Sequence, residues 1–331
     1  MRRFLKALCI LPSLLLASPA VAQTTASRID AHIETAKVAA GLDWRNTFVN
    51  LCLPATPLPP NFPPPTPAVA PDPAGWYAPP LKVFDNLYWL GTRQHSSWAL
   101  QTSEGLIIID TNFHWATDPE IVSGLLTLGL NPRDIKYVLI SHAHGDHDQG
   151  AATLQSRYGA RIVMGAPDWE DTLRRPADAP GGVPRRDISV GRDGMNLTLG
   201  DTTVRIVPTP GHTPGTLSYV FPVKNGSATL MAAYSGGTIM RGFGADPARW
   251  DEYIASQRRI ARAAADANAT VMLSNHSEFD GAYTRARLIP AARQLGEDHP
   301  FIVGRESVQR YFTVMTECAM AAKLRATAPQ R

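Results

Sequence analysis

A cluster of metal-binding residue types lies near the middle of the 331-residue chain. Four potential ligands fall within six residues of the segment Ser141-His142-Ala143-His144-Gly145-Asp146-His147. Neutral imidazole and carboxylate are the groups that bind zinc when thiolates are absent. His142 and His144 are two residues apart, so an extended backbone directs both side chains to one side. A strand-to-helix turn here can deliver two ligands to one metal ion and two to a neighbouring ion.

Two more histidines follow predicted strands. His212 stands in the turn Pro208-Thr209-Pro210-Gly211-His212-Thr213-Pro214-Gly215. Its prolines and glycines restrict the backbone, and a preorganised ligand has less ordering cost on binding. His276 comes directly after the apolar run 271–274. A turn histidine is more often structural than a ligand, but beside the first cluster we interpret both as ligands of a two-metal site.

Short apolar runs and helical patterns alternate twice along the chain, and they set the positions of these histidines. Apolar runs bounded by turn residues predict strands. They are expected at 82–84, 87–90, 97–102, 106–109, 137–140, 162–164, 196–199, 203–207, 216–221, 228–233 and 271–274. A short helix followed by an arm is expected over 27–50, and further helices are expected at 117–129, 147–158, 247–267, 283–294 and 304–323. Strands followed by helices, twice over, predict an α/β fold of two halves packed sheet to sheet, with helices outside.

The N-terminus has the layout of a secretory signal peptide over residues 1–22. Arg2, Arg3 and Lys6 precede a mostly apolar run, and Ala20-Val21-Ala22 offers small residues for cleavage. A membrane anchor is the alternative, although the run is short for a bilayer span. The segment 23–80 is expected to be a helix and a proline-rich arm, because 54–80 holds twelve of the 28 prolines. The globular domain is expected over 81–331, in the periplasm or outside the cell.

Composition limits the possible partners. The predicted signal segment carries three positive charges, so its removal takes the formal net charge from +3 to zero. A neutral chain without a basic stripe gives no reason to expect a nucleic-acid or membrane partner. We expect a monomer that acts on a small molecule.

Two cysteines remain after Cys9 leaves with the signal segment. In an exported chain, Cys52 and Cys318 suggest one disulfide that ties the N-terminal arm to the last helix. Two free thiols are the alternative. Neither cysteine has metal-ligand spacing to another cysteine, so a thiolate zinc site is not expected.

Taken together, these motifs resemble the metallo-β-lactamase superfamily. The resemblance rests on His-x-His-x-Asp-His, Thr-Pro-Gly-His-Thr-Pro-Gly and a lone histidine after a strand, and it runs from about Leu81 to Met320. Within the superfamily, stretches such as 83–88, 96–98 and 105–111 resemble class B β-lactamases of the third subclass. The resemblance implies a four-layer αββα sandwich.

The resemblance also implies a ligand set and a reaction. One zinc would take His142, His144 and His212, and a second would take Asp146, His147 and His276. Two zinc ions per chain would provide hydroxide at neutral pH for attack on the lactam amide of a β-lactam. Asp146 would orient the proton of that nucleophile. Asp110 and Ser141 are candidates for orienting the imidazoles.

The substrate is less defined than the metals. Relatives such as glyoxalase II and lactonases place a metal-bridging aspartate after the strand that follows His212, whereas the stretch here is Ala232-Ala233-Tyr234-Ser235-Gly236-Gly237. The serine that β-lactamase relatives use two positions beyond Ser235 is replaced by Gly237. Ser235, Thr238 and Asn275 are the candidate substrate contacts, and Trp98 and Tyr234 could line the cleft or belong to the core.

Two other functions stay open. A hydrolase of the same fold could act on an ester, a lactone or a thioester. A non-catalytic zinc-binding module is the second alternative. All six ligand positions are filled, and three protein ligands per metal leave room for water, which favours an enzyme over a closed structural site.

Overall fold

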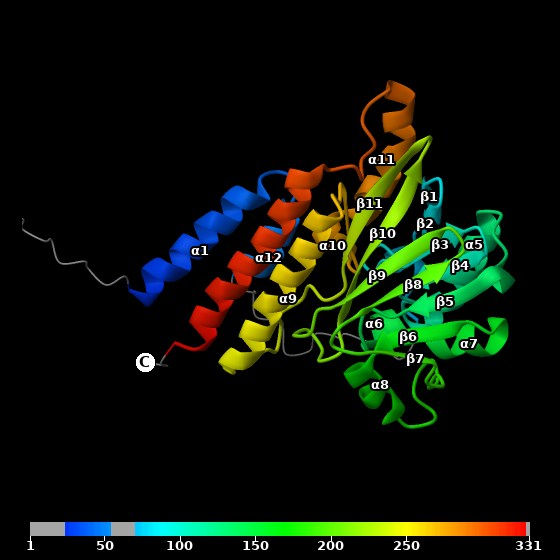
Figure 1. Ribbon diagram of the computed structural model, residues 1–331, viewed down its shortest axis with the longest axis horizontal. Coiled ribbons are helices and arrows are strands. Elements are labelled where there is room, and N and C mark those ends of the chain that lie inside the picture. The colour runs from blue at the N-terminus through cyan, green and yellow to red at the C-terminus, as the bar shows by residue number, and fades with distance from the viewer. Residues whose placement is uncertain (1–23, 54–69, 329–331) are drawn as a thin grey trace, which may run out of the picture.

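Two β-sheets packed face to face form the centre of the molecule. The computed structural model describes residues 24–53 and 70–328. A core of apolar side chains from both sheets, including Trp98, Ile107, Phe221 and Leu273, lies between them. Helices cover the outer face of each sheet (Figure 1). The fold is therefore the expected four-layer αββα sandwich.

The first sheet has seven strands in the order β1-β2-β3-β4-β5-β6-β7. They are β1 Leu81–Phe84, β2 Leu87–Trp89, β3 Trp98–Thr102, β4 Gly105–Ile109, β5 Ile135–Leu139, β6 Arg161–Gly165 and β7 Ile188–Val190. Neighbours pair antiparallel as far as β4 and in parallel from β4 to β7. Strand β4 is apolar throughout because both its faces are covered: Ile107 and Ile109 face the other sheet, whereas Leu106 and Ile108 face helices.

The second sheet has five strands in the order β12-β11-β10-β9-β8. They are β8 Met195–Leu199, β9 Thr202–Pro208, β10 Leu217–Asn225, β11 Ala228–Ser235 and β12 Val271–Ser274. Only β11 and β12 pair in parallel, so both end at the same edge. Residue 276 therefore emerges beside the end of β11.

Helices against the first sheet differ most from the sequence expectation. They are α4 His114–Ala116, a π-helix Thr117–Val122, α5 Ser123–Thr127, α6 Gly145–Asp148, α7 Ala151–Tyr158 and α8 Ala166–Leu173, with 3-10 turn Pro132–Asp134. The helix expected at 117–129 is thus interrupted, and its first part has the wider π turn. The helix expected at 147–158 is divided, because the first turn belongs to the metal-binding segment. Helix α8 and edge strand β7 were not predicted.

Helices against the second sheet include the N-terminal segment. They are α1 Thr25–Ala40, α2 Arg45–Cys52, α9 Pro247–Asp266, α10 Ser277–Asp280 and α12 Arg305–Ala326. Helix α11 Ala282–Leu295 instead contacts β1 and adds buried side chains to the core between the sheets, and α3 Pro73–Trp76 lies beyond the undescribed gap. The arm expected after the first helix is in fact α2. Trp44 is fully buried and donates from Nε1 to the carbonyl of Ser307 at 2.8 Å. Cys52 and Cys318 form a disulfide, as expected.

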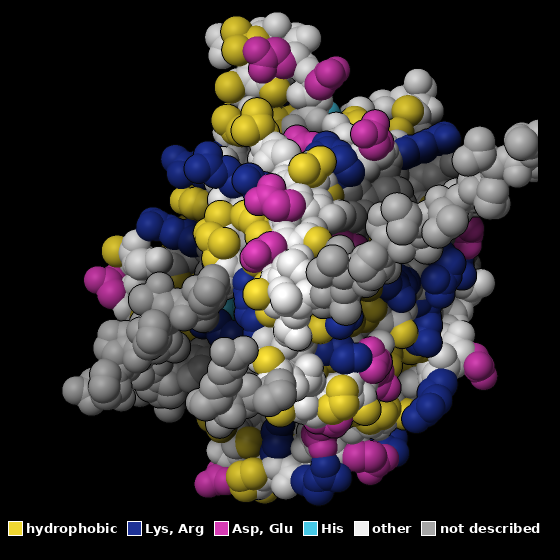
Figure 2. Space-filling model, turned by 90° about the vertical axis from the view of Figure 1, so that its left-hand side faces the viewer, with side chains coloured by type: hydrophobic (Ala, Val, Ile, Leu, Met, Phe, Trp, Pro, Cys, Tyr) yellow, Lys and Arg dark blue, Asp and Glu magenta, His cyan; other side chains and the backbone are white. Residues whose placement is uncertain are grey.

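The outer surface of the helices that cover the second sheet shows no dominant charge. On the visible part of this face, basic and acidic side chains are interspersed with apolar ones (Figure 2). Within residues 24–53 and 70–328, none of the helices is both long and apolar enough to cross a membrane. The expected signal segment lies outside the described residues.

Candidate metal centre

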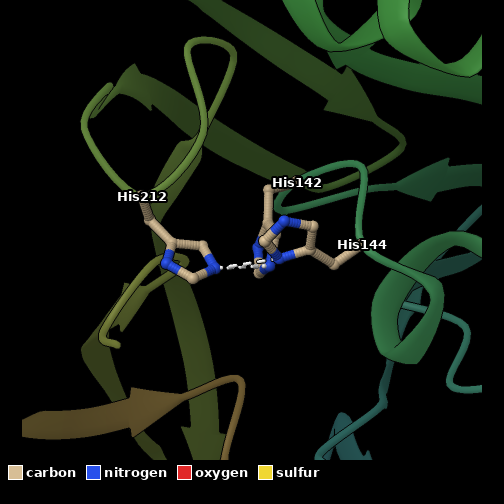
Figure 3. Close-up of side chains that lie close together, drawn as sticks. All are labelled: His142, His144 and His212. Carbon is tan, nitrogen blue, oxygen red and sulfur yellow. Dashed lines mark hydrogen bonds between the residues drawn. The ribbon is translucent and has the colours of Figure 1, made fainter. Parts of the chain in front are cut away.

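Three imidazoles from two loops meet at the edge where the sheets end. His142 and His144 lie in the segment between β5 and α6, and His212 lies on the turn between β9 and β10. The Nε2 atom of His212 lies 3.1 Å from Nε2 of His142 and 3.0 Å from Nδ1 of His144. Figure 3 shows the three rings pointing toward one another. These residues are called the first group below.

The turn that carries His212 depends on glycine. Gly211 has a φ of 134°, and a Cβ atom there would lie 2.7 Å from the Cβ of Tyr253 on α9. Any larger residue would therefore push the turn away from the helix. The guanidinium of Arg249 holds the same turn by donating to the carbonyls of Gly211 and His212. The position of this histidine is fixed by backbone geometry as well as by its side chain.

Three side chains form a second set of ligand atoms beside the first group. The Oδ2 atom of Asp146 lies 3.0 Å from Nε2 of His147 and 3.2 Å from Nε2 of His276. The two Nε2 atoms are 3.1 Å apart. The structure thus brings all six sequence-predicted ligands together, in the two sets that the resemblance implied.

His95 was missed by the sequence reasoning. Its Nε2 atom lies 3.5 Å from Oδ2 of Asp146, and His95, Asp146 and His276 can be grouped around one metal ion. We call Asp146, His147, His276 and His95 the second group. No neighbouring ligand type in sequence marks His95, which stands alone between β2 and β3. The only available signal was a histidine between two buried strands that lead to the same edge.

Backbone carbonyls fix two rings of the first group. Nδ1 of His142 donates to the carbonyl of Gly236 at 2.8 Å, and Nδ1 of His212 donates to the carbonyl of Ile239 at 2.6 Å. A carbonyl can only accept, so the proton of each neutral ring is on Nδ1 and the lone pair is on Nε2. Two lone pairs therefore face each other at 3.1 Å, an arrangement that a cation between them would stabilise.

A carboxylate fixes the ring of His147 in the second group. Its Nδ1 atom donates to Oδ2 of Asp110 at 3.1 Å. The same carboxylate accepts from the hydroxyls of Ser141 at 2.8 Å and Tyr234 at 2.7 Å. Asp110 is fully buried, and its φ of 59° lies in the left-handed region that few residues other than glycine adopt. The hydrogen bonds of this network hold it in that conformation. The roles proposed for Asp110 and Ser141 thus match contacts in the structure.

The two groups differ in electrostatics. Burial lowers the pKa of His212 to about 3, and burial also lowers the pKa values of His142 and His144. Burial alone would lower the pKa of His147, but the carboxylates of Asp146 and Asp110 raise it to about 10. The first group is thus neutral without a metal, whereas the second holds a proton that a metal ion would replace.

The donor set fits zinc. In the first group His212 Nε2 lies 3.0–3.1 Å from the ligand atoms of His142 and His144, and in the second group the ligand atoms of Asp146, His147 and His276 lie 3.0–3.2 Å from one another. These distances are close to the roughly 3.4 Å expected between ligands about 2.1 Å from a tetrahedral zinc. Orienting hydrogen bonds on the far side of the rings are typical of zinc sites. His144 is exposed and Asp146 is 18% exposed, so solvent reaches the centre from this side.

The three predicted substrate contacts lie beneath the metal centre. Ser235, Thr238 and Asn275 are each 1% exposed. Nδ2 of Asn275 donates to the carbonyl of Gly236 at 2.9 Å, and the hydroxyl of Thr238 contacts that of Ser274. Direct contact with a substrate stays a prediction, and the burial of all three argues against it. Trp98 and Tyr234 are fully buried and belong to the core.

The sequence matches one protein family. A profile of the metallo-beta-lactamase superfamily matches residues 90–263, which is more than half of the chain. The chain belongs to this superfamily. The protein is thus a hydrolase of this superfamily, whose fold typically binds metal ions such as zinc, in agreement with the two groups described above.

Similar solved structures carry the name metallo-beta-lactamase. A subclass B3 metallo-beta-lactamase of Bradyrhizobium japonicum is 28% identical with a TM-score of 0.60, covering 73% of this chain and 93% of that one. A metallo-beta-lactamase of Cronobacter sakazakii is 27% identical with a TM-score of 0.63, covering 83% and 100%.

Curated relatives carry a different name. A hydroxyacylglutathione hydrolase of Rhodopseudomonas palustris is 27% identical over 221 residues, or 62% of this chain and 80% of the relative. The same enzyme of Acidiphilium cryptum is 39% identical over 87 residues, which is 26% of this chain and 31% of the relative. Hydrolysis is common to both sets of similar proteins, whereas the bond that is cleaved differs.

Proposed function

We propose that the protein is an exported, zinc-dependent β-lactamase that hydrolyses the lactam amide of β-lactam antibiotics. The observation that carries this proposal is the end of β11, where Ser235-Gly236-Gly237 lies against the metal groups without a carboxylate. Hydrolases that resemble glyoxalase II place a metal-bridging aspartate in this stretch. Asp146 is the single carboxylate among the ligand atoms of the two groups.

Close packing of the backbone around Gly236 and Gly237 explains why no carboxylate stands there. A Cβ atom on Gly236 would lie 1.7 Å from the carbonyl oxygen of Leu217. A Cβ atom on Gly237 would lie 2.7 Å from Cγ2 of Thr216 and 2.8 Å from Cβ of His212. Neither position has room for an aspartate unless the backbone moves. This packing supports a β-lactamase more than a hydrolase that needs a bridging carboxylate.

The chemistry divides between the metal and the protein. Zinc, when bound, supplies an activated water molecule and polarises the carbonyl that is attacked. The imidazoles of the first group hold it, with Gly236 and Ile239 fixing two rings. Burial alone would raise the pKa of Asp146, but His147 and His276 hold it well below its usual range. An ionised carboxylate beside the opening can accept a hydrogen bond from the attacking water and so orient it.

Thioester hydrolysis is the second candidate function. The name of the Rhodopseudomonas palustris relative, hydroxyacylglutathione hydrolase, favours it, since the match covers 80% of that protein. The proposed export favours the β-lactamase instead. The disulfide between Cys52 and Cys318 supports export, because such bonds persist in oxidising compartments.

A substrate panel tests the proposal. Purified, zinc-loaded protein would be assayed with nitrocefin, a penicillin, a carbapenem, S-lactoylglutathione and an acyl-homoserine lactone, each with and without a chelator. We expect chelator-sensitive hydrolysis of the β-lactams. The variant His142→Ala is the matched control, because it removes one first-group ligand and should abolish the same activity. Hydrolysis of S-lactoylglutathione alone would refute the β-lactamase proposal and support the second candidate.

A further inference from the structure

We propose that His95 is a fourth protein ligand of the second metal site. This inference rests on the metal centre of the proposed function. The resemblance to zinc β-lactamases assigns only Asp146, His147 and His276 to this metal, whereas the structure adds the Nε2 atom of His95 at 3.5 Å from Oδ2 of Asp146.

The distance fits two ligands of one metal ion better than an ion pair. Charge-assisted hydrogen bonds between nitrogen and a carboxylate are about 2.7–2.9 Å long. Two ligand atoms at zinc–ligand distances of about 2.1 Å and a tetrahedral angle are roughly 3.4 Å apart. The His95–Asp146 distance of 3.5 Å matches the second value.

The backbone holds His95 beside His276. The two residues form an isolated antiparallel bridge. On either side of it, the amide of Ser96 donates to the carbonyl of Asn275 at 2.9 Å, and the amide of Ser277 donates to the carbonyl of Gln94 at 2.7 Å. The ring centroids of His95 and His276 are 4.9 Å apart. Segments far apart in the sequence are therefore locked together where the ligand is needed.

The ring of His95 is positioned as a ligand should be. Its Nδ1 atom lies 3.3 Å from the hydroxyl of Thr92, which also accepts from the His95 amide at 2.8 Å. The ring of Phe113 packs edge-on against it at a centroid distance of 5.0 Å. The side chain is only 13% exposed. Preorganisation of this kind is typical of a ligand and is uncommon for a surface histidine.

A fourth ligand would give the two sites different characters. Three protein ligands leave a zinc coordination position open for water, whereas four close a tetrahedral site. The first group would then be the place where substrate and water bind. The second would be a closed site that holds its metal tightly.

Zinc and cobalt binding test the inference without an activity assay. Metal-free wild type, His95→Ala and His95→Gln would be titrated with zinc in competition with a chromophoric chelator. His32→Ala is the control, because His32 is a partly exposed histidine on α1 that pairs with Glu317. We expect one of the two zinc ions to bind at least about tenfold more weakly in both His95 variants, and no change in the control.

The cobalt(II) spectrum gives a second readout. The visible absorption of cobalt(II) depends on its donor atoms and on their number, so exchanging the His95 imidazole for water should change the absorption bands of one of the two ions. Thermal unfolding of the metal-free proteins shows whether each variant is folded; if His95→Ala is not, His95→Gln is compared with wild type.

Unchanged zinc affinity and an unchanged cobalt spectrum in a folded His95 variant would overturn the inference. A wild type that binds no zinc would refute the proposed function itself. A wild type that binds two zinc ions but cleaves no β-lactam would refute the proposed substrate and leave the role of His95 intact.

Discussion

The two ligand groups of this protein are neighbours, yet they differ in charge, in exposure and in what orients them. The first group is uncharged and exposed at His144, and backbone carbonyls fix its rings. The second contains the carboxylate of Asp146, and a buried carboxylate, Asp110, fixes His147. A metal in the first group therefore keeps more of its positive charge and faces solvent. A site that activates water requires these properties, whereas we propose that the second group mainly retains its metal.

Removing one imidazole from each group gives the largest expected effects and tests this difference directly. His212→Ala should lower the rate of β-lactam hydrolysis by roughly 10³-fold or more, because it removes metal chemistry worth several kcal/mol. His276→Ala should cost less, about 10–100-fold, because the open site stays intact. Steady-state kinetics and zinc content would be measured for both variants. A larger loss in His276→Ala would reverse the roles that we assign to the two groups.

Asp110→Asn is expected to affect one group only. An amide can still contact Ser141 and Tyr234, but it cannot match the charge that holds the Nδ1 proton of His147. We expect the second zinc to bind about 10–100-fold more weakly, as is typical when an orienting carboxylate is lost. Stepwise zinc removal by a chelator would show whether the first zinc is unchanged. Equal weakening of both would mean that Asp110 supports the whole centre and not the second group alone.

The sequence was sufficient to predict where those candidate ligands lie whose position depends on local structure. The segment from His142 to His147 lies at a strand-to-helix turn, and the turn around His212 is fixed by its own prolines and glycines, so spacing and backbone chemistry predict both. Strand β12 was predicted at its observed bounds, 271–274, because its four residues are buried on both faces.

Features that depend on tertiary packing were not predictable in the same way. His95 becomes a candidate ligand only because its loop pairs with the one that carries His276. Helix α2 looked like an arm because its own pattern is weakly apolar, and packing against α12 is what buries Leu51 and Cys52. The burial of Ser235 and Asn275 likewise follows from how the loops close over the sheet edge, which residue types do not reveal.

An effect that needs no substitution is a difference in how pH acts on the two metals. In the metal-free protein, the raised pKa of His147 contributes stability that is fully present below pH 6.5 and is lost as the pH rises through about 10. Zinc must displace that proton, so its affinity for the second group should rise about tenfold per pH unit between pH 7 and 9. The lowered pKa of His212 leaves the first group already neutral, so the zinc affinity of that group should stay flat in this range.

Calorimetric titrations in buffers of different ionisation enthalpy would count the released protons. We expect about one proton from these side chains for the second zinc and none for the first. Equal proton release at both sites would mean that the electrostatic contrast between the groups disappears once the metal-free protein is in solution, and the distinction between an open, neutral site and a closed, charged one would lose its physical basis.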